Sequence, residues 1–158
     1  MKIEILCIGK LKEAYWRDAV AEYSKRLTAY CDLKITELKE ARLNGTGPAA
    51  EEAVRVAESA DLLAHIGRDD YVITLEVKGR RLTSEQLADK LQECALAGQS
   101  SLVFVIGGSL GFDSSVSRRA NLRLSFSDMT FPHQMMRVIL LEQVYRGFKI
   151  NRGETYHK

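Results

Sequence analysis

The last third of the sequence carries side chains that are able to move a proton or stabilise a charge. The chain ends in Tyr156, His157 and Lys158, which place a phenol, an imidazole and an ammonium group side by side. His133 lies at the start of a helix-like segment, where it can cap the helix or contact a ligand, and Arg137 follows in the same segment. A tail of this kind can close over a substrate and take part in proton transfer. It can equally be a frayed terminus, and His133 can be structural, so the residues alone leave both interpretations open.

A glycine-rich turn is the second feature that suggests chemistry. Gly107, Gly108 and Gly111 directly follow an apolar run at residues 101–106 (SLVFVI). Glycines let a backbone approach a ligand closely and leave amide groups free to face it, although the same pattern also occurs in plain tight turns. The sequence has no GxxxxGKS/T, GxGxxG or GxSxG motif. A P-loop nucleotide hydrolase, a usual dinucleotide-binding domain and a hydrolase with a nucleophile elbow are therefore not expected.

Strand-like and helix-like segments alternate along the chain. Runs rich in β-branched residues predict strands at 2–8, 33–38, 71–77, 101–106 and 122–126. Apolar periodicity and start signals predict helices at 11–30, 48–64, 84–97, 113–120 and 132–148. The polar residues 78–81 (KGRR) are expected to turn the chain out of the third strand. Strands separated by helices pair in parallel, so we predict a single α/β domain over residues 1–158, with a parallel-type sheet and helices on both faces.

The parallel strands also predict where a ligand would bind. In open α/β sheets, ligands lie outside the carboxyl ends of the strands. Three segments follow strands in this way, at residues 75–79, 107–112 and 126–131. We therefore expect the site at the edge of the sheet where these three segments meet.

The segment 132–148 predicts an unusual helix. Pro132 has no N–H to lose in a first helical turn, so it marks the helix start. Apolar residues are spread around nearly the whole circumference, unlike the single stripe of a surface helix. The helix is either a central core helix or one that packs on its own sheet on one side and on a second subunit on the other, as in a homodimer. A charge at Leu141 or Val144 should then dissociate or unfold the protein.

Composition bounds the possible partners. The net charge is +2, but residues 114–158 hold eight Lys and Arg against three acidic residues. A basic region beside a candidate site suits RNA or another polyanion, although it is often only a solvated surface. The three cysteines, Cys7, Cys31 and Cys94, lack the spacing of a metal site, so reduced thiols and no metal are expected. No signal peptide or membrane span is recognisable, which predicts a soluble cytoplasmic protein.

Several segments together resemble a known family. They are residues 104–111 (FVIGGSLG), residues 124–137 (LSFSDMTFPHQMMR) and the ending from YRGFK at 145–149 to the terminal YHK, and the opening KIEILCIGKLK and the segment ITLEVKG also fit. The chain is similar to the RlmH family, SPOUT-class enzymes that methylate N3 of a pseudouridine in the helix 69 region of bacterial 23S ribosomal RNA. The likeness covers essentially the whole chain, and its final third is the specific part.

The resemblance implies a C-terminal trefoil knot, S-adenosylmethionine as cofactor, a homodimer through the last helix, and 23S ribosomal RNA in the large subunit or whole ribosome as partner. It places the cofactor at the three strand ends. The implied cofactor residues are Leu75, Gly107, Gly108, Phe126, Ser127, Asp128, Met129, Thr130 and Phe131. The acidic side chain of Asp128 leaves open whether its loop contributes backbone contacts alone.

The chemistry of the implied substrate suggests roles for the polar residues. An imide N–H such as pseudouridine N3 is poorly nucleophilic until its proton leaves, so a base or a stabilising cation is required nearby. The candidates are Tyr156, His157 and Lys158, with His133 and Arg137 as helpers that position groups or neutralise charge. Two other functions compete with this one: a non-catalytic ribosome-binding assembly factor, and a SPOUT enzyme that methylates transfer RNA ribose.

Overall fold

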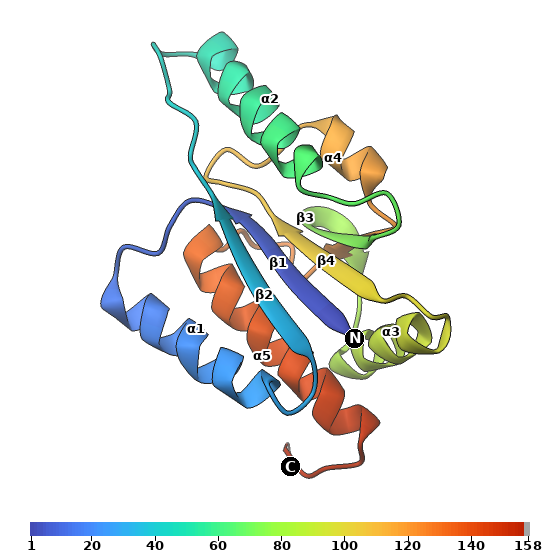
Figure 1. Cartoon of the computed structure of the whole chain (residues 1–158). Coiled ribbons are helices and arrows are strands. Elements are labelled where there is room, and N and C mark those ends of the chain that lie inside the picture. Colours follow the sequence, from blue (N-terminus) through green and yellow to red (C-terminus); the bar gives the residue numbers. More distant parts are fainter. Residues whose placement is uncertain (157–158) are drawn as a thin grey trace.

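A five-stranded parallel sheet forms the centre of the protein. The computed structural model describes residues 1–156 (Figure 1). The strands are β1 (Lys2–Ile8), β2 (Asp32–Leu38), β3 (Tyr71–Arg81), β4 (Ser101–Ile106) and β5 (Leu122–Ser125), in the order β2-β1-β4-β3-β5. Every neighbouring pair is parallel. The carboxyl ends of all these strands therefore lie at one edge of the sheet.

Helices cover both faces of the sheet. They are α1 (Ala14–Leu27), α2 (Pro48–Ala64), α3 (Ser84–Leu96), α4 (Ser114–Arg119) and α5 (His133–Asn151). Helices α1, α3 and α5 pack on one face, and α2 and α4 pack on the other (Figure 1). Strand β1 shows how alternation divides the core, because Ile3 and Ile5 pack toward α5 whereas Leu6 and Ile8 pack toward α2. The predicted α/β class is confirmed, and the trefoil knot stays a prediction of the resemblance.

The expected helix at 11–30 is shorter at both ends. The backbone N–H of Leu11 donates to the Glu37 carboxylate at 3.1 Å, and the Arg17 guanidinium donates to the carbonyl oxygen of Leu11 at 3.2 Å. These contacts hold residues 11 and 12 in a loop against β2, so α1 begins only at Ala14.

Strand β3 corrects a sequence prediction. Residues 78–81 do not turn out of the strand but continue it to Arg81. Leu124 of β5 is paired with both Leu75 and Arg80, so the intervening residues bulge out of the ladder. A Cβ atom on Gly79 would lie 2.7 Å from the carbonyl oxygen of Arg123. The chain passes close over β5 at this point because position 79 has no side chain.

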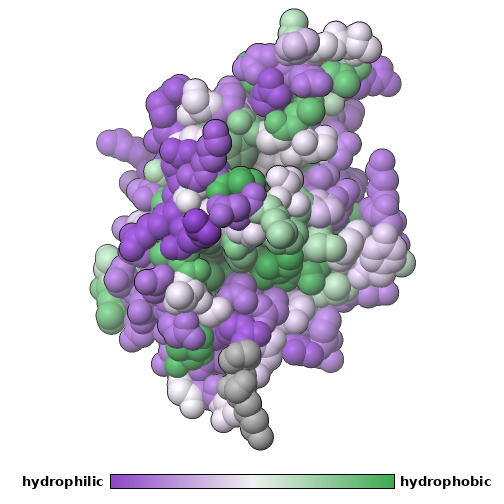
Figure 2. Space-filling view, turned by 180° about the vertical axis from the view of Figure 1, so that it is seen from behind, coloured by the Kyte–Doolittle hydropathy of each residue, from purple (hydrophilic) through white to green (hydrophobic). Residues whose placement is uncertain are grey.

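Helix α5 is the central helix of its face, flanked by α1 and α3. Its residues Leu141 and Val144 are fully buried in the core of their own chain, so a charge at either position tests folding rather than subunit association. The opposite side of the helix carries Val138 and Ile139, which are only half-buried. Figure 2 shows this face of the molecule, where apolar surface gathers in the middle and hydrophilic surface surrounds it.

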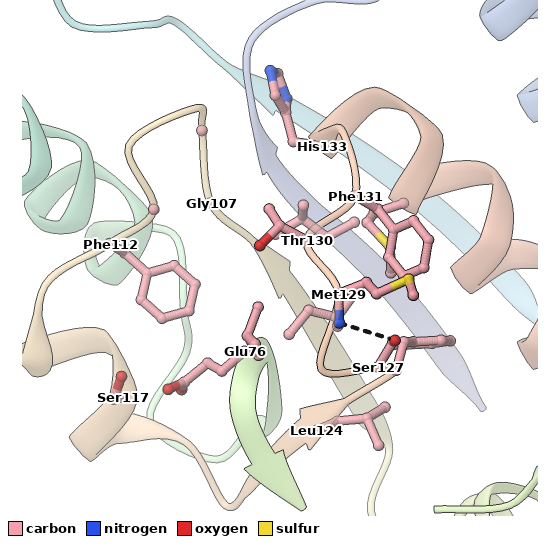
Figure 3. Close-up of a pocket in the computed structure, with 17 residues that line it drawn as sticks. Glu76, Gly107, Phe112, Ser117, Leu124, Ser127, Met129, Thr130, Phe131 and His133 are labelled. Carbon is pink, nitrogen blue, oxygen red and sulfur yellow. Dashed lines mark hydrogen bonds between the residues drawn. The ribbon is translucent and has the colours of Figure 1, made fainter. Parts of the chain in front are cut away.

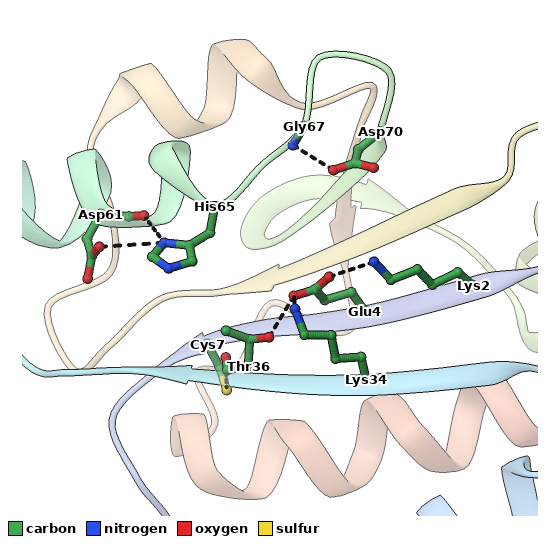
Figure 4. Close-up of polar contacts among 9 residues, drawn as sticks. All are labelled: Lys2, Glu4, Cys7, Lys34, Thr36, Asp61, His65, Gly67 and Asp70. Atoms are coloured by element: carbon green, nitrogen blue, oxygen red, sulfur yellow. Dashed lines mark hydrogen bonds and ion pairs between the residues drawn. The ribbon is translucent and has the colours of Figure 1, made fainter.

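A polar cluster occupies the part of the other face that α2 and α4 leave open (Figure 4). The buried carboxylate of Glu4 accepts hydrogen bonds from Thr36 at 2.6 Å and from Lys34 at 3.0 Å. Burial alone would raise the pKa of Glu4, but the hydrogen bonds from Thr36 and Lys34 and the nearby lysine charges outweigh it and lower that pKa. The cluster thus ties β1 to β2 through an ionised side chain.

None of the helices in residues 1–156 has both the length and the apolar character needed to cross a membrane.

Candidate functional site

A cavity of about 300 Å³ lies at the carboxyl edge of the sheet, between the ends of β3, β4 and β5 and the start of α5 (Figure 3). The three segments expected to meet at this edge do meet there. Eight of the nine residues predicted for the cofactor line the cavity, namely Leu75, Gly107, Gly108, Phe126, Ser127, Met129, Thr130 and Phe131. Their binding of a cofactor stays a prediction.

The glycine-rich segment forms a tight turn on one side of the cavity. The N–H of Gly111 donates to the carbonyl oxygen of Gly108 at 3.0 Å, and Gly111 has a φ of 72°. A Cβ atom on Gly107 would lie 3.1 Å from the backbone of Gly111 and 3.0 Å from the Phe112 ring. The turn therefore has a physical need for glycine at positions 107 and 111.

Serine hydroxyl groups hold the loop that follows β5. The buried Ser125 hydroxyl lies 2.8 Å from the carbonyl oxygen of Val77 and 3.1 Å from that of Ser127. The Ser127 hydroxyl accepts the N–H of Met129 at 3.0 Å (Figure 3). These short polar contacts shape residues 126–131 and leave the cavity itself unfilled.

Asp128 is the predicted cofactor residue that does not line the cavity. Its carboxylate forms an ion pair of 3.0 Å with Arg81, and both side chains are exposed to solvent. The side chain of Asp128 thus faces the surface beside the cavity. Any contact between this loop and a cofactor would involve the residues next to Asp128 and not its carboxylate.

Glu76 and His133 are the two titratable residues in the cavity wall. One carboxylate oxygen of Glu76 accepts the hydroxyl of Thr74 at 2.7 Å, and the other accepts the Arg123 guanidinium at 2.9–3.0 Å. The Nδ1 atom of His133 is buried and has no hydrogen-bond partner. Burial, helped by the charge of Arg137, lowers the pKa of His133, so its ring is neutral at pH 7.

Arg137 lies one turn further along α5 and is outside the cavity wall. Its side chain is 2% exposed. The guanidinium donates to the Glu37 carboxylate at 2.7 Å and to the carbonyl oxygens of Ile8 and Gly9 at 2.7 and 2.8 Å. Arg137 therefore joins α5 to the ends of β1 and β2, and its role as a helper of the reaction stays a prediction.

Tyr156 lies away from the cavity of its own chain. Its ring stacks edge-on against Tyr145 with centroids 4.9 Å apart, and its hydroxyl lies 3.3 Å from the Glu142 carboxylate. Glu142 is nine positions after His133 in α5, a distance of about 14 Å along the helix axis. Burial, with hydrogen bonds to Tyr23 and Glu142, raises the pKa of Tyr156 to about 12. His157 and Lys158 lie outside the described residues.

Sequence reasoning missed several residues of the cavity wall. Ser117 comes from α4, Leu124 from β5 and Met136 from the first turn of α5. Met136 had a usable signal, since it is three positions after His133 and shares its helix face. Ser117 had none, because no local pattern shows that α4 turns toward β3.

Within residues 1–156, no group of three or more His, Cys, Asp or Glu side chains is arranged to hold a metal ion.

Comparisons with known proteins agree with this architecture. A family model described as "Predicted SPOUT methyltransferase" matches residues 1–157. Curated relatives called "Ribosomal RNA large subunit methyltransferase H" from Clostridium novyi and Bifidobacterium adolescentis are each 50% identical over the full length of both chains. A relative of the same name from Streptococcus equi subsp. zooepidemicus is 48% identical, again over both full lengths.

A solved structure shares the fold. It is described as a probable methylase family protein from Haemophilus influenzae, and it superposes with a TM-score of 0.55 over 99% of this chain and 70% of its own. The sequence identity is 13%, so this similarity concerns the fold alone.

Proposed function

Because the chain belongs to the SPOUT methyltransferase family, we propose that it transfers a methyl group from S-adenosylmethionine to N3 of a pseudouridine in 23S ribosomal RNA, in the helix 69 region and in the cytoplasm. The observation that carries this proposal is the cavity at the carboxyl edge of the sheet, into which three separate strand ends bring eight of the predicted cofactor residues. The relatives' shared name supports large-subunit ribosomal RNA as the substrate.

The cavity suits S-adenosylmethionine in size and chemistry. A volume of about 300 Å³ is at the lower end of the range for small-molecule sites. Its walls are largely apolar and include the carboxylate of Glu76. The glycine turn that forms one side depends on the absence of a Cβ atom at Gly107. When bound, the cofactor supplies a methyl group on a positively charged sulfur. The protein's task is then to hold the cofactor and align the acceptor.

The transfer must also remove a proton from the acceptor. The N3–methyl bond forms as the sulfur–methyl bond breaks, the bonding pair stays on sulfur as a neutral thioether, and the N3 proton leaves. Neutral His133 is the cavity-wall residue whose side chain is suited to accept a proton. Its ring points away from Glu76 and Phe112 in Figure 3, so it would have to turn toward the cavity to do so. Tyr156 is protonated at neutral pH in its present position, so there it would donate a hydrogen bond rather than act as a base.

A basic surface beside the cavity suits the RNA backbone. Exposed cationic residues gather on the second half of β3 and on the adjoining α4 and β5, namely Lys78, Arg80, Arg81, Arg118 and Arg123. Neither Lys78 nor Arg80 forms an ion pair with another residue of the described chain. Lys78 follows directly on Glu76 and Val77 of the cavity wall, so phosphates bound here would bring a nucleotide near the methyl donor.

We further propose a homodimer that forms through the outward side of α5. Val138 and Ile139 on this side are only half-buried, and the face of the molecule seen in Figure 2 carries apolar surface in its middle. Tyr156 packs against residues 142–146 of its own chain, remote from its own cavity. If the tail takes part in methyl transfer, it must act at the cavity of the partner or leave this position. A dimer through α5 provides the first route.

The proposal is tested by reconstitution. Purified protein is titrated with S-adenosylmethionine by calorimetry, and is then incubated with tritiated cofactor and ribosomes from cells that lack the protein. We expect cofactor binding and a tritiated methylpseudouridine in digested 23S ribosomal RNA. A protein that fails to bind the cofactor would instead be an assembly factor, and label in a transfer RNA ribose would indicate the other enzyme class.

A further inference from the structure

Among residues 1–156, the wall of the cavity contains one charged side chain, that of Glu76. Of the residues that line it, Glu76 is acidic, none is Lys or Arg, and His133 is neutral. The Glu76 side chain is 13% exposed, and Figure 3 shows it directed into the space beside Ser117 and Phe112. A carboxylate in an otherwise neutral and mostly apolar wall gives the cavity a negative potential.

The structure holds this carboxylate in one place. Thr74, which is fully buried, donates its hydroxyl to one oxygen at 2.7 Å. Arg123 donates to the other oxygen at 2.9–3.0 Å, but the Arg123 side chain is 50% exposed. Water therefore screens the arginine charge more strongly than the carboxylate charge, and each carboxylate oxygen keeps acceptor capacity beyond these bonds. The pair does not neutralise the cavity.

The two ligands of the proposed reaction differ in charge at one atom. The methyl donor carries a positive sulfonium, and the product S-adenosylhomocysteine carries a neutral thioether at the same position. In a cavity of about 300 Å³, any such sulfur lies within about a Debye length, roughly 8–10 Å, of the carboxylate. A fixed negative charge therefore attracts the donor and leaves the product without that attraction.

We propose that Glu76 is the residue that makes the cavity select the cationic methyl donor over its neutral product. This inference rests on the proposed function, because it takes S-adenosylmethionine as the ligand. Methyl transfer removes the cationic charge from the ligand, so the same carboxylate that favours loading of the donor also favours release of the spent cofactor. Glu76 would act through charge and need not touch the methyl group.

Calorimetric affinities for three ligands test the proposal: S-adenosylmethionine, S-adenosylhomocysteine and neutral 5′-methylthioadenosine. Glu76→Gln keeps the shape and one acceptor oxygen but removes the charge. We expect it to weaken binding of the donor about tenfold, while the affinity for the two neutral-sulfur ligands changes less than about twofold. Arg123→Met removes the cation that partly offsets the Glu76 charge. This variant should therefore prefer the donor over the product more strongly than the wild type does.

Controls separate the possible failures. Glu52→Gln removes a carboxylate that pairs with an arginine on α2, remote from the cavity, and should leave all three affinities unchanged. Retained methylthioadenosine binding by Glu76→Gln shows that the cavity is intact. If wild-type protein binds none of the ligands, the proposed function fails. If wild-type binds them and the donor-to-product ratio is the same in Glu76→Gln, the role of Glu76 is refuted while the function stands.

Discussion

Replacing Arg137 with methionine should destabilise the protein without touching the cavity wall. Methionine keeps most of the side-chain length but removes the three hydrogen bonds to Glu37, Ile8 and Gly9. The two buried carbonyl oxygens would lose their partner at about 1–3 kcal/mol each. The Glu37 side chain is 33% exposed and can regain water, so its contribution is small. We expect a loss of about 3–5 kcal/mol, in the range measured for breaking a buried ion pair.

Urea unfolding followed by circular dichroism measures this loss. Native domains are stable by about 5–15 kcal/mol, so the urea midpoint for Arg137→Met should fall by about a fifth or more. Arg55→Met on α2 is the matched control, because Arg55 pairs with Glu52 on the same helix and the change should cost less than about 0.5 kcal/mol. A loss below about 1 kcal/mol in Arg137→Met, together with abolished methyl transfer, would refute the reasoning and place Arg137 in the chemistry.

Four further predictions follow from the same structure. Gly107→Val should weaken S-adenosylmethionine binding at least tenfold, roughly 1.4 kcal/mol, because the side chain enters the glycine turn; unchanged calorimetric affinity would remove this residue from the site. Ile139→Asp should give a folded monomer in analytical ultracentrifugation, and a monomeric wild type at micromolar concentration would contradict the dimer. Glu4→Gln should cost about 1–3 kcal/mol at pH 7. Because folding lowers the pKa of Glu4, its contribution is present above the unfolded pKa and is lost as pH falls through the folded pKa, so the urea midpoints of wild type and variant should converge as the solution is made more acidic. Deleting residues 156–158 should leave cofactor affinity near wild type and slow methyl transfer about 100-fold. A normal rate of methyl transfer would show that the tail takes no part in the reaction.

The sequence predicted the strands, the helices and the parallel pairing of the sheet because these features depend on local patterns. Alternation and apolar runs located the five strands, and the rule that helices separate parallel strands placed their carboxyl ends together. The same rule predicted that residues 75, 107–108 and 126–131 lie at one edge of the sheet, and all of them except Asp128 line one cavity. The extension of β3 beyond Val77 was missed because the pairing partner is β5, more than 40 residues later, and KGRR has the local composition of a turn.

Side-chain roles were harder to predict because they depend on distant partners. Arg137 binds atoms of residues that are 100 or more positions away in the sequence. Its sequence neighbours therefore gave no sign that its guanidinium is hydrogen-bonded at the ends of β1 and β2. Periodicity around α5 showed that most sides are apolar, but not that Leu141 and Val144 face the chain's own sheet. The position of Tyr156 depends on Tyr145 and Glu142, which no terminal motif encodes.

Nucleoside mass spectrometry of 23S ribosomal RNA tests the central claim most directly. Ribosomes are compared from cells with the protein, cells without it, and cells that carry Gly107→Val in its place. We predict a base-methylated pseudouridine in the first sample and its loss in the other two, with transfer RNA ribose methylation equal in all three. An unchanged 23S ribosomal RNA profile in cells without the protein would contradict the proposed reaction.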